Sequence, residues 1–166
     1  RRVHLAADAV VGPRTLAAIV HRDRVPVRET VARTLAPAAG DVPAKLDAWS
    51  ARLGVDAHLV RALAWMESGY QTRIVSAAGA RGVLQTLPTT RSYVETVLVG
   101  HRLPGTVDGD IEVGVLYLKH LLNVFHGDES LALAGWYQGE RAVRESGVYN
   151  VTKPFVANVL ALRSRM

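Results

Sequence analysis

One glutamate of this chain stands in a position suited to proton-transfer chemistry: Glu67, in the segment WMESGY at positions 65–70. Apolar residues recur at helical spacing before it, at Leu59, Leu63 and Met66, which predicts a helix with Glu67 in its last turn and its end at Gly69. The neighbouring aromatic residues are expected to remove the carboxyl group partly from water, which disfavours its charged form. Glu67 is therefore expected to hold its proton toward neutral pH and to act as a general acid.

The elements that must position this acid are predicted to be helices. Apolar periodicity and capping residues predict helices near residues 45–53, 56–67, 90–97, 110–126, 130–138, 141–145 and 152–166. Asp56, Thr89 or Thr90, Asp110 and Thr152 are the expected N-caps. No segment alternates convincingly in the manner of a strand, and Trp65 is assigned to the core. The pattern predicts a compact, all-α domain.

Composition limits the possible classes. A length of 166 residues suits one domain with a substantial core, with or without a short extension. The net charge of +5 favours polyanionic surroundings such as an anionic cell wall, nucleic acid or lipid headgroups. The chain has no cysteine, which excludes disulfides and thiolate metal sites. Its six histidines form no pair three or four positions apart, so neither a metal site nor a cofactor is predicted.

Several separated blocks, in one order along the chain, carry a family resemblance. They are ESGY at 67–70, VS at 75–76, AGA at 78–80, GVLQTLP at 82–88, GVLYL at 114–118 and LALA at 131–134. These blocks resemble the soluble lytic transglycosylases of the goose-lysozyme-like superfamily. The resemblance implies a lysozyme-like all-α catalytic domain over residues 41–166.

The activity implied by this resemblance is cleavage of the β-1,4 bond between N-acetylmuramic acid and N-acetylglucosamine in peptidoglycan. The muramoyl product would be a 1,6-anhydro sugar, because its own C6 hydroxyl is an internal nucleophile held at high effective concentration. Ordinary glycosidases need two carboxylates. Here Glu67 would act first as the acid and then as the base.

The resemblance also implies substrate contacts. Ser76 and Gln85 would bind sugar hydroxyl or N-acetyl groups through neutral hydrogen bonds, and Leu87 would line an apolar wall. Ser76 as a turn cap and Gln85 as a partner of backbone groups are the structural alternatives. Gly79 and Gly82 would permit left-handed turns or a close approach of the glycan.

The chain departs from the family pattern at GWYQG, positions 135–139, where the family commonly has Ala-Tyr-Asn-Ala-Gly. Trp136 replaces the tyrosine expected to hydrogen-bond the catalytic acid. We expect Trp136 to offer a flat face for a sugar and Tyr137 to supply a hydroxyl group. Phe155 and Val151 replace a family tyrosine and glutamate, so the pocket should be more apolar and the pKa of Glu67 higher.

Residues 1–40 are predicted to be an N-terminal extension. The segment DAVVGPRTLAAI at 8–19 is similar to the end of peptidoglycan-binding repeats, and the start at Arg1 is typical of a fragment or a mature form. The implied substrate places the protein outside the cytoplasmic membrane, with peptidoglycan strands as its partner and without nucleic acid or a membrane span.

Besides a basic helical nucleic-acid binder, which the scattered positions of Lys and Arg disfavour, two other functions are open at this point. A muramidase would hydrolyse the same bond, and Glu140, in place of a family proline, is a possible second carboxylate, although a surface or capping role is favoured. A catalytically silent peptidoglycan-binding module is the other alternative, because the GWYQG run is altered.

Overall fold

The computed structural model describes residues 41–166, and these form a helical body. Its elements are α2 (Asp41–Leu53), α3 (Ala57–Ser68), α4 (Pro88–Tyr93), the π-helical turn η1 (Val94–Leu98), α5 (Val107–Val124), α6 (Glu129–Gln138), α7 (Glu140–Ser146) and α8 (Lys153–Arg163). Within the described part there are two isolated β-bridges and no longer strand, which confirms the all-α prediction. The expected N-terminal extension, residues 1–40, lies outside the described residues.

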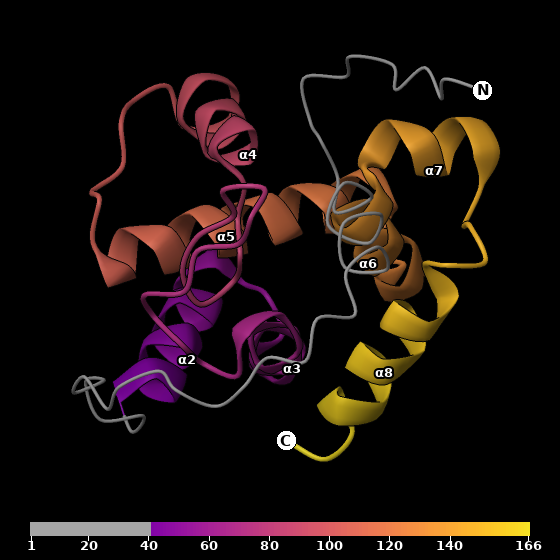
Figure 1. Cartoon of the computed structure of the whole chain (residues 1–166), viewed down its shortest axis with the longest axis horizontal. Coiled ribbons are helices and arrows are strands. Elements are labelled where there is room, and N and C mark those ends of the chain that lie inside the picture. Colours follow the sequence, from indigo (N-terminus) through magenta and orange to yellow (C-terminus); the bar gives the residue numbers. More distant parts are fainter. Residues whose placement is uncertain (1–40) are drawn as a thin grey trace.

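Two groups of helices meet around α5. In Figure 1, α5 crosses the middle of the molecule, with α2 and α3 below it and α6, α7 and α8 to its right. α3 packs against α2 and α8, and α6 packs against α5, α7 and α8. The segment between α3 and α4 passes in front of α5, so the loop that follows the predicted acid lies centrally (Figure 1).

The core is built from the apolar stripes of these helices. Its largest fully buried side chains include Leu46, Leu59, Leu63, Leu84, Ile111, Leu118, Leu121 and Leu133. Burying a leucine side chain contributes about 2 kcal/mol, so these contacts hold the helices together. Between residues 41 and 166, no helix is both long and apolar enough to span a membrane.

The predicted start of α3 is confirmed, but Trp65 is misassigned. Asp56 caps α3, because its Oδ1 accepts a hydrogen bond of 2.7 Å from the backbone N–H of Leu59. Trp65 is 49% exposed instead of lying in the core. Each helical residue advances by about 100°, so Trp65 is turned away from the buried Leu63, two positions earlier.

The starts of α4 and α5 differ from the predictions. α4 begins at Pro88 with Leu87 as its N-cap, because proline at a helix start lacks only an N–H that would stay unpaired there. α5 is capped by Thr106, whose Oγ1 accepts from the Gly109 N–H at 3.2 Å. The predicted cap Asp110 lies inside the first turn, where it forms an ion pair of 2.7 Å with Arg91.

α8 does begin after Thr152, as expected, but the threonine side chain makes no capping hydrogen bond. The hydroxyl oxygen of Thr152 is buried without a hydrogen-bond partner.

Candidate active site

Glu67 is the penultimate residue of α3, where the helix stops abruptly. Gly69 follows in the left-handed conformation, with φ of 58°, and its N–H bonds to the carbonyl oxygen of Trp65. Tyr70 also has a positive φ, 66°. The chain therefore turns away directly after the acid. Ser68 fixes this end of the helix, because its Oγ donates a hydrogen bond of 2.7 Å to the carbonyl oxygen of Val83 in the following loop.

The carboxyl group of Glu67 is enclosed by protein while the residue keeps some exposed surface. Burial raises the pKa of Glu67 from 4.5 to about 7, and a hydrogen bond from Trp136 opposes part of that rise. Among the described residues, no charged side chain contributes to this shift. The expected rise of the pKa above that of an ordinary glutamate is confirmed in direction, and the neutral acid is well populated near pH 7.

Trp136 is the direct partner of this acid. Its indole Nε1–H donates to Glu67 Oε1 at 2.9 Å, and the residue is only 6% exposed. The prediction that Trp136 offers its face to a sugar is not favoured by this burial. The tryptophan instead makes the contact that the family resemblance assigned to a tyrosine at this position.

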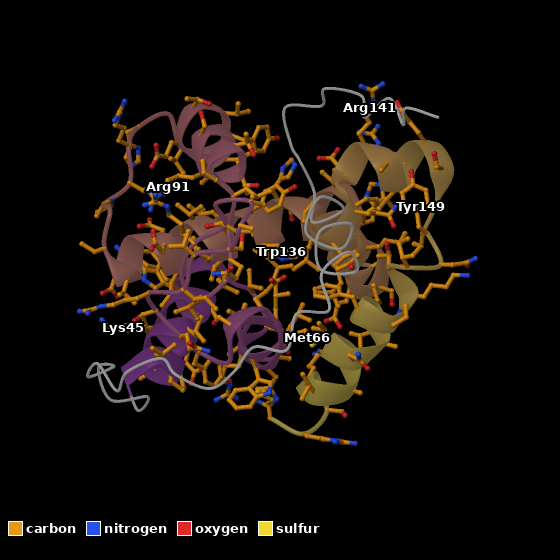
Figure 2. All side chains as sticks on the ribbon, viewed as in Figure 1. Lys45, Met66, Arg91, Trp136, Arg141 and Tyr149 are labelled. Carbon is orange, nitrogen blue, oxygen red and sulfur yellow. The ribbon has the colours of Figure 1, made fainter. Side chains whose placement is uncertain are left out.

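α6 holds the indole in place. The helix is capped by Asp128, whose Oδ1 accepts from the Leu131 N–H at 2.9 Å. Before Trp136, Gly135 allows α6 to lie against Phe125: an added Cβ would come within 2.9 Å of the Phe125 ring. The buried Tyr117 of α5 packs on the indole, with ring centroids 5.5 Å apart. Figure 2 shows Trp136 near the centre of the molecule.

The loop of residues 69–87 holds Ser76 and Gln85 in one hydrogen-bonded frame. Backbone bonds join Arg81 and Thr86 in both directions, at 3.0 and 3.2 Å. Gly79 and Gly82 have φ of 81° and 71°, so the expected left-handed turns are confirmed. At Gly82 an added Cβ would also come within 3.0 Å of Asp110 Oδ2. The loop is therefore held against α5.

The structural alternatives foreseen for Ser76 and Gln85 are both present. Ser76 Oγ accepts from the Ala80 N–H at 3.0 Å, which leaves its own hydroxyl proton available. Gln85 Nε2 donates to the carbonyl oxygens of Ile74 at 3.2 Å and Gly82 at 2.8 Å. Both amide protons of Gln85 are thereby used, and its Oε1 can still accept. Gln85 itself has a φ of 44°, an uncommon conformation of the kind that clusters at functional sites.

Leu87 and Tyr137 are the remaining predicted site residues. Leu87 lines a cavity of about 290 Å³ together with Arg81, Pro88 and Arg91. Tyr137 stacks on Phe155 with ring centroids 4.7 Å apart. Burial raises the pKa of Tyr137, and the charge of Glu67 raises it further, so the tyrosine lies within electrostatic reach of the acid.

Glu140, the possible second carboxylate, is engaged elsewhere. Its Oε2 lies 3.0 Å from His120 Nε2, and its Oε1 accepts from Arg144 at 3.1 Å. It is the first residue of α7, but the N-cap of this helix is Gly139, so the capping role foreseen for Glu140 is wrong. In residues 41–166 no three His, Asp or Glu side chains gather in a way that could hold a metal ion.

Two supporting residues were not singled out from the sequence. Ser68 ties the end of α3 to the loop, and Tyr117 packs on Trp136. Both stand inside the sequence blocks that carry the family resemblance. Membership of a block was therefore the available signal, but it did not indicate what either side chain contacts.

Known structures share this fold. One is an inactive glutamate-to-glutamine mutant of the lytic transglycosylase Slt from Pseudomonas aeruginosa, with a TM-score of 0.64 and 23% identity over 72% of this chain. Others are the 70 kDa soluble lytic transglycosylase Slt70 from Escherichia coli and a complex of a 70 kDa soluble lytic transglycosylase with bulgecin A, each with a TM-score of 0.64 and 22% identity over 73% of this chain. The chain spans 23% of the length of each of these proteins.

At such identities the structural likeness establishes the lysozyme-like fold, and the sequence establishes the family. The profile described as Transglycosylase SLT domain matches residues 45–157, more than half of the chain. The matched segment contains Glu67, the loop with Ser76 and Gln85, and the Trp136 that bonds to the acid. The chain therefore belongs to the transglycosylase SLT domain family.

Proposed function

We propose that this protein is a peptidoglycan lytic transglycosylase in which Glu67 is the single general acid and base. It cleaves the bond between N-acetylmuramic acid and N-acetylglucosamine and releases a 1,6-anhydromuramoyl end. The observation that carries the proposal is the isolated acid: Glu67 has a pKa of about 7, and its hydrogen-bond partner is a neutral indole. Family membership supports the same conclusion.

The reaction requires one proton to leave Glu67 and one to return. The neutral carboxyl group protonates the glycosidic oxygen as the bond from that oxygen to C1 of the muramoyl residue breaks. The C6 hydroxyl of the same sugar then attacks C1, and its proton passes to the Glu67 carboxylate. The acid is regenerated without water entering the product, and no second carboxylate is needed. The engagement of Glu140 by His120 and Arg144 agrees with this scheme.

The loop residues supply complementary contacts to the glycan in this proposal. Ser76 donates its hydroxyl proton to a sugar oxygen, since the bond that its Oγ accepts from the Ala80 N–H leaves that proton unused. Gln85 accepts through Oε1, from a sugar hydroxyl or an N-acetyl N–H, since its amide protons are used. Leu87 provides an apolar wall and Tyr137 a hydroxyl group near the acid. A peptidoglycan substrate implies that the protein acts outside the cytoplasmic membrane.

The decisive experiment is digestion of purified peptidoglycan in water enriched in heavy oxygen, with mass spectrometry of the soluble products. A transglycosylase gives anhydro ends that weigh one water less than hydrolysed ends and carry no heavy oxygen. Labelled reducing ends would instead identify a muramidase. The E67Q variant should release nothing, while E145Q, a change at an exposed acid on α7, should behave as wild type.

A silent binding module makes a different prediction in the same assay. It would bind peptidoglycan and release no product with either the wild-type or the E67Q protein.

For the proposed enzyme, kcat/KM should fall as the pH rises through about 7, because Glu67 then loses the proton that it must donate.

A further inference from the structure

The hydrogen bond between Trp136 and Glu67 can have only one direction. An indole N–H can donate a hydrogen bond but cannot accept one. Glu67 Oε1, at 2.9 Å from Trp136 Nε1, must therefore be the acceptor in both protonation states of the carboxyl group. A tyrosine hydroxyl in this place could both donate and accept, so it would not impose the same restriction.

A neutral carboxyl group has one carbonyl oxygen and one hydroxyl oxygen, and the carbonyl oxygen is the better acceptor. When Glu67 is neutral, Oε1 is accordingly the carbonyl oxygen and Oε2 carries the proton. We propose that Trp136 is a positioning residue that fixes the acidic proton of Glu67 on Oε2 and stabilises the carboxylate that remains after proton donation. The inference rests on the proposed role of Glu67 as the acid.

The hydrogen bond from Trp136 to Glu67 is weaker before Glu67 donates its proton and stronger afterwards, when Glu67 is a carboxylate. A hydrogen bond to a charged oxygen is about twice as strong as one to a neutral oxygen. The N–H of Trp136 therefore stabilises the carboxylate more than the acid, and it does so without a charged side chain next to the reacting sugar. Interactions that strengthen as charge develops lower the barrier to the chemical step.

The surroundings of the indole prevent it from moving away. Trp136 is 6% exposed, Tyr117 packs on it, and the close approach of α6 to Phe125 at Gly135 fixes the backbone that carries it. Burial raises the pKa of Tyr117, so this tyrosine stays neutral and brings no charge to the site. The donor is thus preorganised, and no reorganisation is required when the proton leaves.

The first test follows the indole N–H directly, by nuclear magnetic resonance of protein labelled with nitrogen-15 in its tryptophans. The Nε1–H signal of Trp136 should shift with a midpoint near pH 7 as Glu67 titrates, and E67Q should abolish that shift. The signals of Trp49 and Trp65 serve as internal references. A Trp136 signal that stays constant through the titration of Glu67 overturns the proposal.

The second test combines W136F with W136Y. Phenylalanine keeps most of the ring and removes the donor, so kcat should fall about tenfold with little change in KM, and the pKa of Glu67 should rise by about one pH unit. W136Y should recover part of both effects, and W49F, a change on α2, should alter neither. Loss of activity in W136F with an unchanged pKa of Glu67 refutes the positioning role.

The two tests separate this inference from the proposed function. The titration of the indole signal needs no substrate, and it remains decisive if W136F fails to fold. An inactive wild-type protein whose Trp136 signal titrates near pH 7 would disprove the lytic activity and leave the hydrogen-bond assignment intact.

Discussion

The raised pKa of Glu67 predicts that the acid destabilises the folded protein above pH 5. Well below pH 4.5 both the folded and the unfolded chain hold this proton, so Glu67 does not make the free energy of unfolding depend on pH there. Between pH 4.5 and about 7 the unfolded chain loses the proton while the folded chain keeps it, and the free energy of unfolding falls. At about 1.4 kcal/mol per pH unit, this interval amounts to about 3 kcal/mol.

E67Q removes this penalty, because glutamine is neutral at every pH and its Oε1 can still accept from Trp136. The variant should match wild type near pH 4 and be more stable by about 3 kcal/mol at pH 8, with a Tm higher by about 10 °C. Urea unfolding from pH 4 to 8.5 measures the difference, and E145Q should follow the wild-type curve. If E67Q and wild type differ equally at pH 4 and pH 8, the desolvation argument is wrong.

Three further substitutions test the packing and the hydrogen bonds that hold the helices around the site. G114A should destabilise the fold by about 2 kcal/mol, since an added Cβ would come within 2.8 Å of Leu84 Cβ, and thermal unfolding should show this. S68A removes the bond to the Val83 carbonyl and should cost about 1 kcal/mol in urea unfolding; an S68T variant that also failed to restore stability would argue for a packing effect. D128A removes the N-cap of α6 and should lower stability by about 1 kcal/mol, whereas D128N should be nearly neutral.

Local features of the site were predictable from the sequence because they depend on neighbours in the chain. The 3.6-residue repeat before Glu67 and the glycine after it place the acid in the last turn of α3, as observed. Gly79 and Gly82 marked the turns of the loop. The cap at Asp56 was also correct, because an N-cap bonds to backbone groups only three residues away.

Predictions failed where a local rule met a tertiary constraint. Asp110 has the chemistry of an N-cap, but an ion pair with Arg91, 19 positions away, occupies it, and Thr106 takes the cap. Trp65 is apolar, but it lies on the exposed face of α3 and therefore outside the core.

The sequence alone determined the helical class of this protein, its family resemblance and the choice of Glu67 as the candidate acid, because these follow from periodicity, capping residues and ordered blocks. Only the tertiary structure decided what surrounds the acid. The partner of Glu67 is 69 positions away on α6, and the pKa depends on burial between helices that are distant in the chain. The packing of α3, α5 and α6 thus made Trp136 a hydrogen-bond donor to the acid instead of a surface for a sugar, since side-chain contacts between distant segments are not encoded by local spacing.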